Sequence, residues 1–327
     1  MKKILSISAL LLFCIFGCAH PPVHEIEGTV PIYWGSKHQA PLIQRNSPLF
    51  AAYGWNHSWN RIGTPSARTN EKGEDVIYVD GDRPTIYWMK REFVTQRGSY
   101  TNLIYRVHFS EVPFSLAPFY LTAGKNVGLM VIQTLDANQR PLLVTTVSTC
   151  GCYVAIIPTT HLPEEAYPEG WNLAEPVQVY GETLPSLLDF RNIRLPKLLV
   201  HLRPDLHRVI NLEVVEEALL THPGSHNLIE TPVLPMENLT QIPINGRHTS
   251  FFYEDWPHKG FVKDSFKSWE AISLSLISLD FFVGTDKIYG DSNTTGTRFY
   301  TSLKPWNREV SDMWNFDRFL QFYGWRL

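Results

Sequence analysis

The chain has 327 residues, with 29 Lys and Arg against 32 Asp and Glu, and a formal net charge of −3. This mildly acidic balance, without a basic run, argues against a nucleic-acid partner, because phosphate backbones repel it. Charged residues make up only 19% and aromatic residues 13% of the chain, with 10 tryptophans, which supplies apolar material for a large core.

The first predicted element is an export signal. Lys2 and Lys3 form a short positive segment, and the apolar run Ile4 to Phe16 follows it. A helix of this length rises about 20 Å, well short of the ~30 Å hydrocarbon core of a bilayer. The segment is therefore predicted to be a removable signal peptide rather than a permanent membrane span.

The end of this run, Ile15-Phe16-Gly17-Cys18, resembles the lipobox of bacterial lipoproteins. The resemblance implies that residues 1–17 are removed and that Cys18 carries lipid, palmitate included. Because Ala19 is not Asp, it also implies sorting to the cell outer membrane, with the anchored domain facing the periplasm. An ordinary secretory signal with an incidental cysteine is the alternative.

The predicted domain organisation follows from the composition after the signal. Residues 18–49 are rich in Pro and polar side chains, which predicts a lipid anchor and extended tether. Residues 50–327 have a globular composition without a linker, which predicts a single domain.

Two hairpins are predicted in the first half. The first joins 85–94 to a strand around 103–109 through a turn at 96–99. The second joins 127–135 to 142–153 through a turn at 137–140. Together they predict an antiparallel, meander-like sheet, which a strand at 206–215 would extend. In the predicted strand 103–109, every second residue is apolar, which places four apolar residues on one face: Leu103, Tyr105, Val107 and Phe109.

Two helices are predicted near the C-terminus, which makes the fold class α+β. Asp264 would cap a helix that stops at Gly284, and Ser311 would cap one that stops at Gly324. Both are predicted to pack into the core. Pro-dotted segments at 162–185 and 223–243 are predicted to be long loops. The core-facing residues of the two helices would be Trp269, Ile272, Leu276, Leu279 and Val283 in the first, and Phe316, Phe319, Leu320 and Tyr323 in the second.

The strongest chemical signal is the pair Cys150 and Cys152. Cys14 leaves with the signal and Cys18 carries lipid, so these two have only each other as thiol partners within the mature chain. A disulfide is one interpretation, although residues two apart on a flat strand lie at the limit for pairing, and Gly151 would have to supply a kink. Metal ligation, a redox or nucleophilic thiol, and buried reduced thiols are the others.

A metal site would have to recruit histidines, because two thiolates leave zinc incompletely ligated. His161 is nearest in sequence. Mirror pairing about the turns places Cys150 opposite Val127, and Val127 opposite His108, about 10 Å from the cysteine. The candidate pocket residues are therefore His108, Arg106, His161, His207 and Arg208. No cofactor is required by the sequence, and a metal at the cysteine pair stays an open alternative.

Other motifs are weaker. Trp55 and Trp59 among amides are suited to stacking on envelope glycans, but core packing explains them as well. Asp80-Gly81-Asp82 lacks the further ligands of a calcium loop. Gly290-Asp291-Ser292 is similar to the nucleophile segment of GDS-type esterases but lacks the partner residues of that family.

Three segments carry a whole-chain resemblance. Tyr105-Arg106-Val107-His108-Phe109, the stretch 121–128 and Cys150-Gly151-Cys152-Tyr153 are similar to a group of hypothetical proteobacterial lipoproteins, from about Asn60 onward. The resemblance implies no activity. We therefore expect a lipid-anchored envelope accessory or binding protein, with the membrane and an envelope protein or glycan as partners. A periplasmic metal- or thiol-dependent enzyme that uses the cysteine pair is the alternative.

Overall fold

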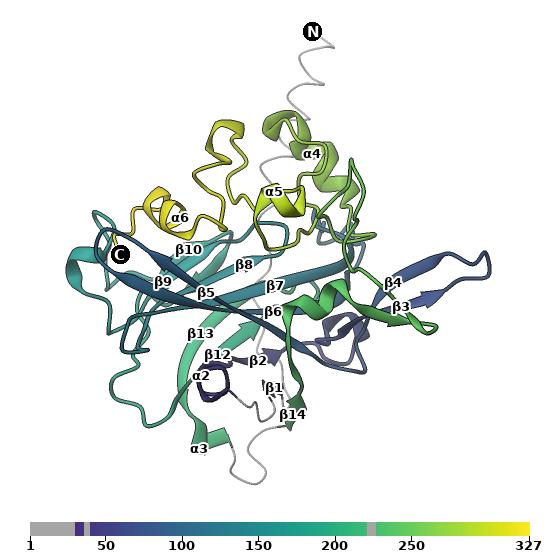
Figure 1. Cartoon of the computed structure of the whole chain (residues 1–327). Coiled ribbons are helices and arrows are strands. Elements are labelled where there is room, and N and C mark those ends of the chain that lie inside the picture. Colours follow the sequence, from purple (N-terminus) through teal and green to yellow (C-terminus); the bar gives the residue numbers. More distant parts are fainter. Residues whose placement is uncertain (1–29, 36–39, 221–226) are drawn as a thin grey trace.

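The computed structural model describes residues 30–35, 40–220 and 227–327 (Figure 1). The predicted signal, the lipobox and Cys18 lie outside the described residues. Strands predominate, and two of the longest helices lie near the C-terminus, so the chain is broadly α+β, as the sequence predicts. None of the helices in the described part of the chain has the length and apolar character needed to cross a membrane.

A six-stranded sheet forms the centre of the molecule. Its spatial order is β15-β5-β6-β7-β8-β9, and every neighbouring pair is antiparallel except β15 with β5. The pairs β5–β6 and β7–β8 are the two predicted hairpins. The strands are β5 (Ile86–Val94), β6 (Ser99–Val112), β7 (Gly124–Leu135), β8 (Pro141–Ser148), β9 (Ala155–Pro158) and β15 (Val233–Pro235).

Both faces of this sheet are buried. On β6 the odd-numbered apolar residues from Leu103 to Phe109 contribute to one core, whereas Ile104 contributes to a second core on the opposite face. Burial on both sides explains why β7 reads as an almost continuous apolar run rather than as a strict alternation. The even-numbered positions of β6 also carry two buried polar residues, Arg106 and His108.

A second sheet of five strands covers one face of the first. Its order is β13-β12-β2-β1-β14, with β12–β13 and β1–β2 antiparallel and β12–β2 and β1–β14 parallel. One core contains residues of both sheets, among them Phe50, Val200 and Tyr105. The strands are β1 (Pro31–Gly35), β2 (Leu49–Ala52), β12 (Pro196–Leu202), β13 (Val209–Glu216) and β14 (Asn227–Thr231).

This second sheet corrects two predictions. β13 does not extend the first sheet, because its partner is β12 in the second one. The folded part of the chain also begins before residue 50, because β1 and helix α2 (Pro41–Asn46) pack within the domain. The tether therefore does not reach residue 49. Short polar-flanked strands carry too little periodicity to be separated from a linker by sequence alone.

The C-terminal segment covers the other face of the six-stranded sheet (Figure 1). Helix α6 (Phe316–Phe322) buries Phe316, Phe319 and Leu320 in the second core, so its predicted packing is confirmed. Its predicted cap is wrong, because the helix begins after Asn315 rather than at Ser311.

Helix α4 (Ser268–Ser278) differs from its prediction in both extent and packing. It begins after Lys267 and ends at Leu279, which has a left-handed conformation (φ 50°). Four of the five apolar residues expected in the core are exposed, with Ile272 at 69% and Leu276 at 84% of their full accessibility, and only Val283, beyond the end of the helix, is buried. The core-packing prediction for this helix is therefore wrong.

Shorter elements complete the chain. Both segments predicted as long loops contain regular structure, which shortens the irregular connections. The strands pair locally: β3 (Thr64–Thr69) with β4 (Asp75–Asp80), β10 (Val177–Val179) with β11 (Glu182–Leu184), and β16 (Ile242–Ile244) with β17 (Arg247–Thr249). The remaining helical turns are η1 (Ser58–Asn60), η2 (Glu164–Ala166), α3 (Glu217–Leu220), η3 (Met236–Thr240), α5 (Ser292–Thr295) and η4 (Pro305–Asn307).

Candidate functional site: the Cys150–Cys152 loop

The two cysteines lie in a tight loop after β8, not on the strand that the sequence predicts to run to residue 153. The backbone N–H of Gly151 donates to the carbonyl of Ser148 (2.8 Å), and the N–H of Ser148 donates to the carbonyl of Cys152 (3.0 Å). Gly151 has a φ of 96°, and a Cβ atom there would lie 2.1 Å from the Tyr300 carbonyl oxygen. Only glycine fits this position, so the kink expected at Gly151 is present.

Both cysteines are free thiols in the structure, Cys150 buried and Cys152 partly exposed. A hydrogen bond between the two sulfurs, followed by the charge of Lys267, lowers the pKa of Cys150 although burial opposes the shift. The same hydrogen bond, together with burial, holds the pKa of Cys152 well above its usual value. Cys150 is therefore the better thiolate of the two, and Cys152 is the one that keeps its proton. The disulfide stays a prediction.

Charged side chains surround this loop, and none of them was a candidate in the sequence. Lys267 Nζ donates to Asp286 Oδ2 (2.7 Å) and to the Gly284 carbonyl (2.6 Å), and both side chains are buried. Asp286 Oδ1 also accepts from the Thr149 hydroxyl and from the backbone of Gly128. This ion pair fixes a positive charge beside Cys150 and ties the loop to β7.

Glu270 and Lys287 complete the cluster. The Cys152 thiol donates to Glu270 Oε1 (3.5 Å), while Glu270 Oε2 is buried without a hydrogen-bond partner. Burial raises the pKa of Glu270, so its carboxyl group can carry a proton. Lys287 Nζ donates to the carbonyls of Cys150 (2.6 Å) and Thr285 (3.0 Å), which holds the loop backbone in place.

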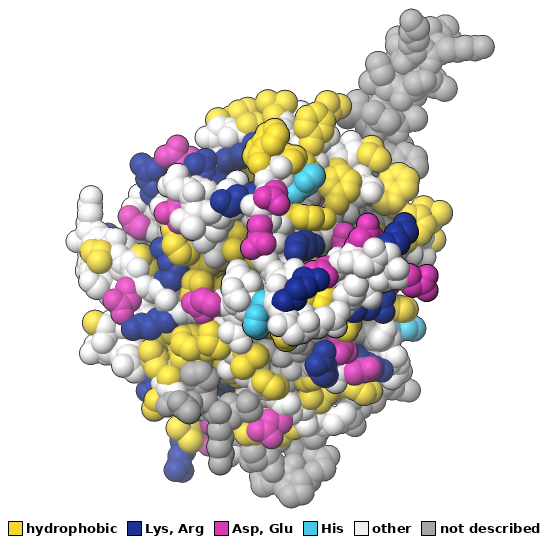
Figure 2. Space-filling model, turned by 45° about the vertical axis from the view of Figure 1, so that its right-hand side comes forward, with side chains coloured by type: hydrophobic (Ala, Val, Ile, Leu, Met, Phe, Trp, Pro, Cys, Tyr) yellow, Lys and Arg dark blue, Asp and Glu magenta, His cyan; other side chains and the backbone are white. Residues whose placement is uncertain are grey.

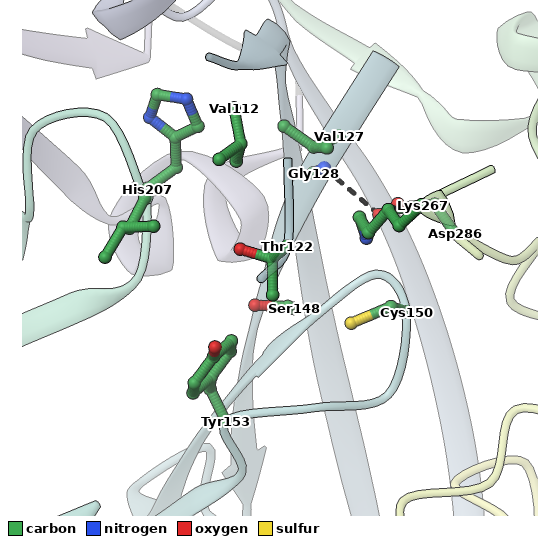
Figure 3. A pocket seen from close by; sticks show the side chains of 11 residues that line it. Val112, Thr122, Val127, Gly128, Ser148, Cys150, Tyr153, His207, Lys267 and Asp286 are labelled. Carbon is green, nitrogen blue, oxygen red and sulfur yellow. Dashed lines mark hydrogen bonds and ion pairs between the residues drawn. The ribbon is translucent and has the colours of Figure 1, made fainter. Parts of the chain in front are cut away.

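A small pocket opens on the Cys150 side of this cluster (Figure 3). The Cys150 sulfur points toward the space near Ser148 and Tyr153. The pocket has a cavity volume of about 20 Å³, which is large enough for one or two water-sized molecules. The lining comes from β6, β7 and the loop between them, the end of β8, the cysteine loop, the 206–207 turn and the segments that carry the ion pair. The residues are Val112, Thr122, Val127, Gly128, Ser148, Cys150, Tyr153, Leu206, His207, Lys267 and Asp286.

Two of the five pocket candidates lie near this pocket. The His207 ring stacks on Phe109 at a centroid distance of 4.1 Å, and its Nε2 lies 2.8 Å from the Glu111 carbonyl oxygen. Arg208 lies 4.8 Å from the centroid of the Tyr153 ring and pairs with buried Glu182 (3.0 Å). His207 therefore lines the pocket, and Arg208 supports its wall through Tyr153.

His108 and Arg106 do not line the pocket. Residue 127 pairs with Phe109, and His108 pairs with Gly128, one position from the predicted register. A shift of one residue moves a side chain to the other face of a sheet. There, Arg106 Nε donates to His108 Nε2 (3.0 Å) and its guanidinium donates to the Lys287 carbonyl (2.9 Å). The pairing of Ser148 with Leu129 agrees with the predicted register of the second hairpin.

His161 lies at the opposite end of β8. Its N–H donates to the Thr159 hydroxyl, which in turn donates to the carbonyl of Pro141, the first residue of that strand. Cys150 follows the last residue of β8, some 25 Å away at about 3.3 Å per residue. His161 is therefore not part of the site. It is close to Cys150 in the sequence, but the length of β8 separates the two residues in the structure.

No group of three or more His, Cys, Asp or Glu side chains suited to a metal ion occurs among residues 30–35, 40–220 and 227–327. The weaker sequence motifs have structural roles. Trp55 donates to the Tyr33 hydroxyl and Trp59 to Asp205, Asp80 pairs with Arg83 in a turn, and Asp291 caps α5.

No protein-family model matches the chain, and no curated protein or solved structure is significantly similar to it.

Proposed function

We propose that this protein is a lipid-anchored component of the bacterial outer-membrane envelope whose folded domain also lies directly against the bilayer. The lipobox resemblance at Cys18 motivates the anchor. The single observation that supports direct apposition is an apolar surface centred on helix α4, which we call the α4 surface. It consists of Phe114, Leu116, Phe266, Trp269, Ile272, Leu276, Ile277, Leu279 and Phe281.

The α4 surface is continuous across two segments of the chain. The ring of Trp269 lies 6.4 Å from Phe114 and 5.8 Å from Phe119, centroid to centroid, so the 113–119 loop extends the helix face. Hydrophobic side chains gather along the upper part of Figure 2, at the level where Figure 1 places α4. Contiguous exposed apolar surface of this kind marks a site of protein or membrane interaction.

Charge favours a bilayer over a protein as the occupant. From residue 268 to 278 the only charged side chain is Glu270, which points inward and is buried. The exposed positions of α4 are Ser268 and large apolar side chains, with Trp269 and two nearby Phe residues suited to the headgroup boundary. The predicted tether between Cys18 and β1 spans at most about 45 Å, which keeps the domain within reach of its own membrane.

The anchor is tested by Cys18→Ala in the full precursor. We expect this variant to lose incorporation of labelled fatty acid that the unsubstituted chain shows. Equal incorporation by both would contradict the lipobox assignment.

The α4 surface is tested by flotation of the unlipidated mature chain, residues 18–327 with Cys18→Ser, on phosphatidylethanolamine and phosphatidylglycerol vesicles. We expect the double variant Ile272→Ser/Leu276→Ser to reduce the vesicle partition coefficient at least about tenfold, because two large side chains lose roughly 1.4 kcal/mol or more of transfer free energy. The matched control is Val94→Ser/Leu195→Ser, at two similarly exposed apolar residues outside this surface. No flotation of the parent chain, or an equal loss in the control, would refute bilayer apposition.

A further inference from the structure

The pocket beside Cys150 combines three features that a purely structural thiol does not need. Its sulfur points into a cavity, a second thiol lies two residues away in the same tight turn, and the side chain of Lys267 lines the same cavity. A small apolar residue would fill the position without a buried ion pair, which is costly to desolvate. The cluster is therefore arranged around the reactivity of the sulfur.

We infer that Cys150 and Cys152 form a reversible dithiol–disulfide site that a small hydroperoxide oxidises, with Cys150 as the attacked sulfur and Cys152 as the residue that closes the disulfide. This site is independent of the proposed membrane apposition and goes beyond it.

The reaction takes place in two steps. The Cys150 thiolate attacks one peroxide oxygen, so that an S–O bond forms, the O–O bond breaks and hydroxide leaves to become water. The Cys152 sulfur then attacks the resulting sulfenic acid, so that the S–S bond forms, the S–O bond breaks and a second water leaves. Two thiols are oxidised to one disulfide while one hydrogen peroxide is reduced to two waters.

The surrounding side chains match these two steps. Lys267, fixed by Asp286, stabilises the thiolate of the first step and the hydroxide that leaves it. Glu270 Oε1 accepts the hydrogen bond of the Cys152 thiol and so can take its proton before the second step. Its other oxygen, Oε2, is buried and has no hydrogen-bond partner in the described part of the chain, so it can hold that proton.

The cavity sets the class of oxidant. A cavity volume of about 20 Å³ fits a molecule of the size of water or hydrogen peroxide, and it favours these over a bulky organic hydroperoxide, which it could not enclose. Tyr153 and His207 stand on its wall. We therefore expect the size of the oxidant to determine how fast it reacts with Cys150.

The test uses the mature chain, reduced with dithiothreitol, desalted and treated with hydrogen peroxide or with cumene hydroperoxide. Maleimide labelling and intact mass follow the thiols. We expect hydrogen peroxide to remove both thiols together, to react at least about tenfold faster than cumene hydroperoxide, and to leave a product that dithiothreitol restores. Slow oxidation, equal rates for the two peroxides, or independent loss of the thiols would overturn the proposal.

Single substitutions assign the roles. In Cys152→Ser, oxidation should stop at a sulfenic acid on Cys150, which dimedone traps with a defined mass increase. Cys150→Ser should leave Cys152 at least about tenfold less reactive. Glu270→Gln, which keeps the shape of the side chain, should slow disulfide closure without slowing the first oxidation. A sulfenic acid on Cys152 in the parent chain, or equal rates in the two serine variants, would refute the assignment.

Discussion

The same substitution in two C-terminal helices gives a sharp test of their different packing. Leu320 of α6 is 1% exposed and Leu276 of α4 is 84% exposed. Leu320→Ala leaves a cavity in the core and should lower the free energy of unfolding by roughly 2–5 kcal/mol. Leu276→Ala removes atoms that already contact solvent and should change it by less than about 0.5 kcal/mol.

Urea denaturation of the unlipidated mature chain, followed by tryptophan fluorescence, measures both effects. The shift in the midpoint at constant slope gives the change in stability. Each variant is the control for the other, because the residue removed and the residue introduced are identical. A loss above about 1.5 kcal/mol for Leu276→Ala would show that α4 packs against the domain in solution, and a loss below about 1 kcal/mol for Leu320→Ala would refute the packing of α6.

Three further predictions concern the site and its support. Gly151→Ala should destabilise the domain by more than about 2 kcal/mol in thermal unfolding, because its Cβ would strike the Tyr300 carbonyl; Gly73→Ala, with a similar φ of 80° and open space, should cost only about 1 kcal/mol. An equal cost at both glycines would contradict the close approach. Glu182→Gln, which leaves two buried arginines without their carboxylate, should cost roughly 3–5 kcal/mol in urea denaturation, and a neutral effect would show that the pair is solvated. Burial lowers the pKa of His207 to about 4, so the unfolded chain binds the extra proton between about pH 6.5 and 4 and stability should fall as the pH falls through that window. His207→Gln should flatten this dependence, and an unchanged slope would exclude His207 as its cause.

Local sequence patterns determined the elements whose partners are close in the chain. The hairpins β5–β6 and β7–β8 follow from runs of strand-forming residues bounded by short turns, and the register about the 138–139 turn follows from its length. The stripe Phe316, Phe319 and Leu320 likewise predicts a buried helix face. These features depend on interactions within about twenty residues.

The tertiary structure decided what depends on distant segments. The loop between β6 and β7 contains no feature that fixes its register, and the difference of one residue placed His108 on the face opposite Val127. β13 joined the sheet that also contains β1 and β2, because its partner β12 pairs with β2.

The candidate site also contains some residues that the sequence identified and others that only the tertiary structure brought together. The sequence singled out Cys150 and Cys152, because the predicted signal cleavage and lipid attachment leave them no other thiol partner. Lys267, Glu270 and Asp286 were missed, because an apolar helical stripe at 264–284 predicted the opposite face of α4 as the buried one. Periodicity shows that a helix has an apolar face, but only the packing of the whole chain decides whether that face or the charged one is turned inward.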